Sequence, residues 1–144
     1  MLLLGVGAGV LTVWWHHARG QEEERQRAAA ERRRADAHDM LVRMAQAIER
    51  VLLHGRTDVT PTHPVLQWID PKTKKRIDDG MQKDPWGGAW TARLVTPSEI
   101  EVVSGGADKA PGGMGDARDV RLSVRIDALS KKVSSSIEDV EEKQ

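Results

Sequence analysis

The glycine-rich stretch SGGADKAPGGMGDARDV, from Ser104 to Val120, holds the side chains of this sequence that are best suited to chemistry. Asp108, Asp116 and Asp119 fall within twelve residues, separated by several glycines. Glycine allows the positive φ angles that turn backbone carbonyls inward. Three carboxylates and such carbonyls form a set of hard oxygen ligands that suits Ca²⁺. The same pattern is also typical of an exposed hairpin loop in which Asp and Gly only form turns, and the spacing leaves both interpretations open.

The sequence gives less support to other metal sites and to a catalytic site. The loop contains no His or Cys, which disfavours zinc and copper. Ala110 and Gly112 stand where an EF-hand needs oxygen ligands. The whole chain lacks cysteine, so disulfides and thiol nucleophiles are excluded. Its five histidines are scattered without a Ser/His/Asp pattern, so no enzyme is expected. The adjacent His16 and His17 are more simply interfacial residues than a metal pair.

Length and charge limit the architecture. At 144 residues the chain has room for one small domain and an additional element. The 22 basic and 22 acidic residues balance, so no overall field favours nucleic acid as a partner. An Arg/Glu-rich segment after residue 18 interleaves both charges, which is typical of a solvated helix face.

The apolar run MLLLGVGAGVLTVWW opens the sequence. It is short of the roughly 20 residues that span a bilayer core, but its tandem Trp14 and Trp15 suit a membrane interface. A signal peptide fits less well because no basic residue precedes the run. A buried helix fits less well because the charged segment that follows offers nothing to pack against. The pattern predicts that residues 1–18 form a hydrophobic membrane-anchor segment.

A long helix is predicted over residues 19–55. This segment has no proline and is rich in good helix formers. Its first half is polar on all sides. Its second half places apolar residues at steps of three and four, which predicts that its last turns dock on a domain. The repeating apolar residues are Leu41, Met44, Ala45, Ile48, Val51 and Leu52.

Residues 56–126 are predicted to form a loop followed by a small antiparallel sheet that includes the candidate calcium loop, 104–120. The runs Trp90–Val95 and Ile100–Ser104 flank the turn signal TPSE. Apolar and polar residues alternate from Asp119 to Ile126, as in a half-buried strand. Residues 127–144 are charged and Ser-rich, and are expected to be a polar tail, either disordered or a short exposed helix. The fold class is therefore α+β, with a long N-terminal helix packed on the sheet.

Two linked motifs carry a resemblance to a known family. DPWGGAWTARLV and SGGADKAPGGMGDARDV resemble the C-terminal region of the major pseudopilin of the type II secretion system. Asp84, Pro85, Trp86 and Gly87 match that family's turn into its first strand, whereas Gly88 replaces the usual Asn. The start and the end of its calcium loop are matched by Ser104, Gly106, Ala107 and Asp108 and by Asp116, Asp119 and Val120. The likeness covers roughly residues 35 to 126.

The resemblance implies a ligand set and a function. The metal ligands would be the side chains of Asp108, Asp116 and Asp119, with backbone carbonyls of Gly105 and of Met114 or its neighbour Gly113. The chain would be a calcium-stabilised structural subunit of a type II secretion system, which exports proteins across the outer membrane. It would be anchored in the inner membrane by a single pass, with its C-terminal domain in the periplasm.

The expected partners are other pseudopilins, or further copies of this chain, and inner-membrane proteins of the secretion system. The likeness also places Trp86 against the helix, where its ring should be buried. An alternative is a membrane-tethered calcium-binding module that recognises another envelope protein without polymerising.

The N-terminal end departs from the family pattern. The family's processing site contains a Phe and a Glu, whereas this sequence has no Phe and no acidic residue before Glu22. Two expectations remain: that a leader lies upstream of Met1, or that the chain is a relative that stays anchored.

Overall fold

The structure is a computed structural model that describes residues 6–54, 65–96, 98–109, 118–127 and 132–140, with side chains from residue 15 onward. The chain divides into two compact units, Met1–Arg32 and Arg33–Gln144. The described residues of the first unit are all helical, and the second unit contains the rest of the helix and the sheet.

Helix α1 runs without interruption from Val6 to Leu53. From residue 15 to residue 28 its side chains are exposed, and Arg19 forms an ion pair with Glu23 one turn later. Over Ala37–Val51 the predicted apolar stripe is buried, whereas Leu52 is half-buried. No helix in the described part of the chain is long and apolar enough to cross a membrane.

The four-stranded antiparallel sheet has the order β1-β2-β3-β4, with each strand beside its neighbour in sequence. The strands are β1 (Thr91–Thr96), β2 (Glu99–Ser104), β3 (Asp119–Ile126) and β4 (Val133–Val140). The hairpin and the third strand were predicted to within one residue at each end. A helix packed on an antiparallel sheet is also the predicted α+β class, which is therefore confirmed.

The expectation of a disordered or helical tail is wrong for residues 133–140. These residues form β4, which pairs with β3 along its whole length. Val133 and Ile137 face the same side as the buried Leu122 and Val124 of β3, because directly opposed residues share a face of the sheet. Pairing with β3 therefore decides the conformation of a segment whose own composition is polar.

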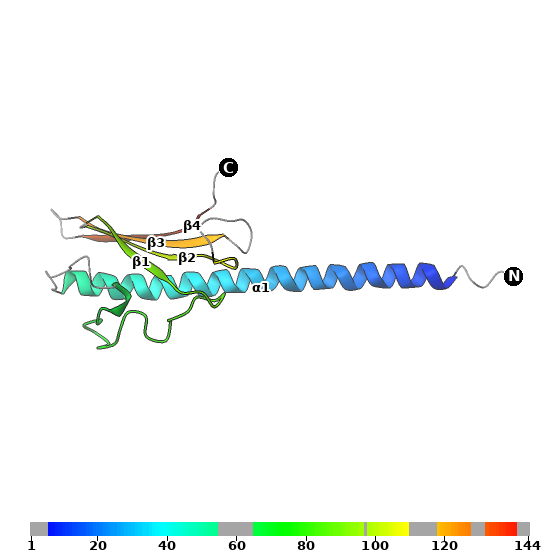
Figure 1. The fold of residues 1–144 in the computed structure, drawn as a ribbon, viewed down its shortest axis with the longest axis horizontal. Coiled ribbons are helices and arrows are strands. Elements are labelled where there is room, and N and C mark those ends of the chain that lie inside the picture. Colours follow the sequence, from blue (N-terminus) through cyan, green and yellow to red (C-terminus); the bar gives the residue numbers. More distant parts are fainter. Residues whose placement is uncertain (1–5, 55–64, 97, 110–117, 128–131, 141–144) are drawn as a thin grey trace. The chain divides into compact units, whose positions relative to one another are not determined.

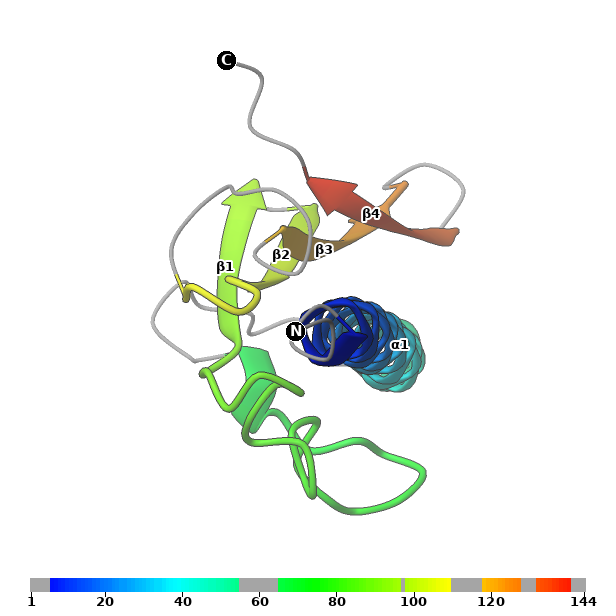
Figure 2. The same cartoon turned by 90° about the vertical axis from the view of Figure 1, so that its right-hand side faces the viewer.

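A hydrophobic core holds the Arg33–Gln144 unit together. It lies between the sheet and the part of α1 along which the sheet runs (Figure 1). The sheet lies against one side of α1, and the segment that precedes β1 passes along another flank of the helix (Figure 2). The fully buried side chains come from both elements and include Leu41, Met44 and Ile48 of α1 and Ile100 and Leu122 of the sheet. Burying each such side chain contributes about 1.5–3 kcal/mol, so this packing is the main source of stability.

A partly buried ion pair joins the segment before β1 to the end of α1. Arg50 donates through Nε and Nη2 to the two carboxylate oxygens of Asp70, at 3.0 and 2.7 Å. Asp70 is 2% exposed and also accepts from the Lys72 backbone N–H and the Thr73 hydroxyl. The Arg50 guanidinium, together with these two donors, holds the pKa of Asp70 well below its usual range. The short 3₁₀ helix η1 (Val65–Gln67) and Trp68 then cover the core from this side.

Candidate functional site

The turn at Asp84 is organised by that residue's carboxylate. Oδ1 accepts hydrogen bonds from the backbone N–H groups of Trp86, at 3.1 Å, and Gly88, at 2.6 Å. The Asp84 N–H donates to the Gly88 carbonyl, and the Gly87 N–H donates to the Asp84 carbonyl, both at 2.9 Å. Asp84 is 5% exposed, so its charge is stabilised by these fixed donors and hardly by water.

Two glycines make the turn possible. Gly87 has φ +79°, a conformation that L side chains rarely adopt. Gly88 lies so close to Asp84 that an added Cβ would stand 2.9 Å from its Oδ2. Glycine at position 88, where the pseudopilin pattern has Asn, therefore fits the path of this turn.

A buried hydrogen bond joins the turn to the start of the glycine-rich loop. Ser104, the last residue of β2, donates from its hydroxyl to Oδ2 of Asp84 at 2.5 Å, and Ser104 is fully buried. The Ser104 Oγ also accepts from the Gly106 N–H at 3.3 Å, and Gly106 has φ +60°. The two sequence motifs thus meet in space through one carboxylate and one hydroxyl.

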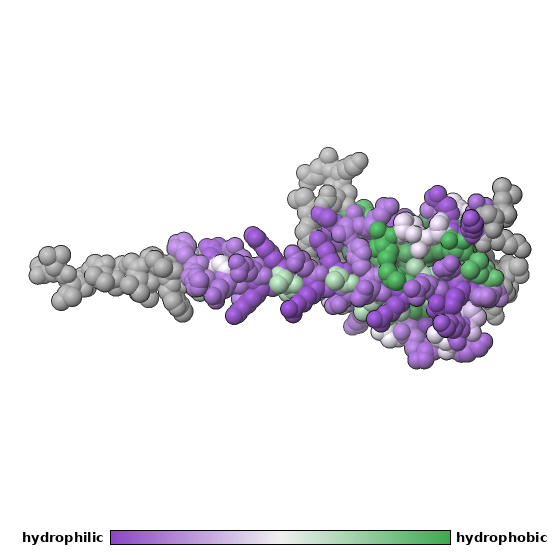
Figure 3. Space-filling model, turned by 180° about the vertical axis from the view of Figure 1, so that it is seen from behind, coloured by the Kyte–Doolittle hydropathy of each residue, from purple (hydrophilic) through white to green (hydrophobic). Residues whose placement is uncertain are grey.

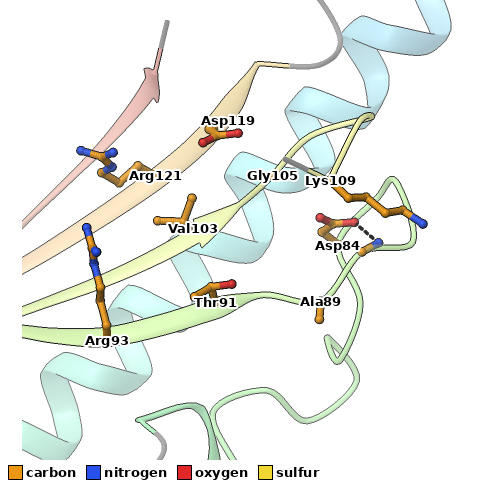
Figure 4. Close-up of a pocket in the computed structure, with 10 residues that line it drawn as sticks. Asp84, Ala89, Thr91, Arg93, Val103, Gly105, Lys109, Asp119 and Arg121 are labelled. Carbon is orange, nitrogen blue, oxygen red and sulfur yellow. Dashed lines mark hydrogen bonds between the residues drawn. The ribbon is translucent and has the colours of Figure 1, made fainter. Parts of the chain in front are cut away.

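A hollow of about 440 Å³ opens beside this contact (Figure 4). Asp84, Gly105, Lys109 and Asp119 line one end, and Arg93 and Arg121 line the other, on the sheet face that points away from α1. Asp119, the first residue of β3, is 4% exposed. The hollow therefore brings two acidic residues and the loop residue Gly105 to one end of the sheet.

The predicted calcium ligands are only partly covered by the structure. Asp119 and Gly105 both line the hollow, and Asp108 lies on the exposed part of the loop that follows Gly105. Asp116 and Met114 fall outside the described residues. The described residues contain no group of three acidic or histidine side chains close enough to hold a metal ion. The oxygen chemistry of Asp119 and Gly105 fits Ca²⁺, and the ligand set stays a prediction.

An ion cluster on the outer sheet face was not predicted. Glu101 of β2 is 5% exposed although its face points away from the core. Its two carboxylate oxygens contact Nε of Arg93 on β1 at 2.5 Å and Nε of Arg121 on β3 at 2.8 Å. The residue types could have suggested this cluster, since an acid in a central strand with basic residues on both neighbouring strands is a common cross-strand arrangement.

Trp86 is less buried than expected. Its ring packs against the core but stays half-exposed, whereas Trp90, four residues later, is 7% exposed. Trp90 directly precedes β1 and belongs to the buried core, so it is the principal aromatic anchor of this region.

Comparisons with known proteins identified no relative of this chain. No family model, no curated protein and no solved structure matches this chain.

Proposed function

We propose that this chain is a pseudopilin-like structural subunit of a type II secretion system, stabilised by one Ca²⁺ ion. The observation that carries the proposal is the buried Ser104–Asp84 hydrogen bond. Two motifs that resemble the same family in sequence lie together in space, on a helix-and-sheet fold of the expected class.

The calcium loop has a definite role in this proposal. It connects β2 to β3, and its two ends are held by Ser104 and Asp119, both buried. A cation bound to Asp108, Asp116 and Asp119 would neutralise their mutual repulsion and order the connection between the central strands. The proposed subunit acts by packing and needs no catalytic group.

Attachment to the inner membrane belongs to the same proposal and rests on the sequence of residues 1–18. The Arg33–Gln144 unit would then face the periplasm, where the loop could bind Ca²⁺. The proposed partners are other pseudopilins and inner-membrane proteins of the secretion system.

The test is secretion in the organism that encodes this chain. Deleting the coding region should retain exported proteins in the periplasm, and re-expression of the full chain should restore export. The Asp119→Asn variant should restore export poorly, whereas Asp36→Asn, on the exposed face of α1, should restore it fully. Normal export after deletion, with protease protection of the C-terminal unit in spheroplasts, would contradict the proposal.

A further inference from the structure

Within the described residues, the outer edge of β4 has no neighbouring strand to pair with its backbone groups. β4 is an edge strand of the described sheet, and its eight residues pair with β3 on one side. Its pairing register has no bulge and the strand contains no Pro. Its two charged residues, Glu138 and Asp139, lie near its end, so the stretch from Val133 to Ile137 carries no charge that would protect the edge. The edge therefore presents backbone donors and acceptors to which another strand can add.

The sequence around this edge is self-complementary in charge. Residues 131–139 read KKVSSSIED, with two basic residues before an apolar–serine–apolar centre and two acidic residues after it. If two copies pair antiparallel about Ser135, Lys132 of one copy lies opposite Glu138 of the other, and Val133 lies opposite Ile137. A two-fold axis repeats each pair, because residue i contacts j and j contacts i.

The side chains on both faces of the sheet are compatible with this antiparallel register. Val133 and Ile137 are half-buried and pack at the margin of the core, so pairing would extend the apolar layer on the helix side. Figure 3 shows hydrophobic residues gathered on one face of this unit. Glu138 is exposed on the opposite face, in register with Arg121 of β3, so its carboxylate is accessible to a second cation. Opposite charges and apolar pairs directly across strands are the arrangements that stabilise sheets.

We propose that β4 is a dimerisation edge at which two copies of this chain pair antiparallel about Ser135 and join their sheets into one. This contact uses neither the calcium loop nor residues 1–18. The dimerisation proposal can therefore be tested independently of the proposed function. Because a two-fold contact closes on itself, it pairs chains and does not by itself extend a filament.

The absence of cysteine from the chain permits a direct crosslinking test on the full-length protein. Directly opposed residues of an antiparallel pair have Cα atoms about 4.5–5.5 Å apart, which is within disulfide range. In chelator and mild detergent, Ser135→Cys should form a disulfide dimer under a gentle oxidant. Ser134→Cys mixed with Ser136→Cys should crosslink better than either variant alone. Val95→Cys on β1, the other edge strand, is the matched control because it is 49% exposed.

Charge reversal provides a second test that does not depend on disulfide chemistry. Glu138→Lys and Lys132→Glu should each weaken dimerisation at least about tenfold in sedimentation, because each sets like charges opposite one another. The Lys132→Glu/Glu138→Lys double variant should restore it. Equal crosslinking of Val95→Cys and Ser135→Cys, or a double variant as weak as the single ones, would overturn the proposal.

Discussion

Replacing Asp84 by alanine removes the acceptor that three hydrogen-bond donors share. The Trp86 and Gly88 N–H groups are half-buried and can recruit water, but the Ser104 hydroxyl is fully buried and cannot. Hydrogen bonds to a charged group contribute roughly 1.5–3 kcal/mol each. The Ser104 bond is lost in full, whereas water partly replaces the acceptor for the two N–H groups. Asp84→Ala should therefore lower the free energy of unfolding by about 3–4 kcal/mol.

The assay is urea or thermal unfolding of the full chain followed by tryptophan fluorescence, in the presence of chelator. A loss of this size should lower the melting temperature by about 12–16 °C for a unit of this size. Ser104→Ala alone should cost about 1.5–3 kcal/mol. The double variant should cost about 1–2 kcal/mol less than the sum of the two, because both remove the same bond.

Two exposed residues serve as controls. Ser134→Ala on β4 and Asp79→Ala, whose exposed carboxylate forms an ion pair with the exposed Lys75, should each change stability by less than about 0.5 kcal/mol. The reasoning would be refuted if Asp84→Ala cost less than about 1 kcal/mol, or if its effect and that of Ser104→Ala added to within about 0.3 kcal/mol.

Three further predictions concern single side chains. Trp90→Ala should cost about 3–5 kcal/mol in urea unfolding and Trp86→Ala clearly less, because only Trp90 is fully within the core; equal costs would be evidence against this assignment. Gly88→Ala should lower the melting temperature by several degrees, because its Cβ would stand 2.9 Å from the Asp84 carboxylate; an unchanged melting temperature would show that the turn adapts freely. Asp70 has a lowered pKa in the folded state because of Arg50, so its stabilisation is complete above the unfolded pKa of about 3.9 and is lost as the pH falls through the lower folded value. Acid titration of unfolding should show this loss in the native chain and not in Asp70→Asn, and identical acid profiles would contradict it.

The helix and the first three strands were predictable because each carries its own periodic pattern. Leu41, Met44 and Ile48 recur at helical spacing, and the alternation along β3 marks its buried face. Strand β4 was not predictable in this way. Its inward positions are Val133, Ser135, Ile137 and Asp139, so only two of four are apolar, and its conformation depends on pairing with a neighbour that its own sequence does not reveal.

The candidate site was predictable in its residue types and only partly in its contacts. The motif around Asp84 and the serine that begins the loop were both identified, but they lie twenty residues apart and spacing alone cannot pair them. The Arg50–Asp70 pair was missed for the same reason, although an Asp before Pro-Lys-Thr is a signal for a side-chain-closed turn. Such contacts arise only when the core brings separate segments together.

Calcium titration of the full chain by calorimetry tests the central claim most directly. We predict one Ca²⁺ per chain, with binding abolished in Asp119→Asn and retained in Asp36→Asn, and with Mg²⁺ binding much more weakly. At a hundredfold excess of Ca²⁺ over its Kd, the free energy of unfolding should rise by about 2.7 kcal/mol. No heat of binding up to millimolar Ca²⁺, with a melting curve that chelator leaves unchanged, would contradict the account.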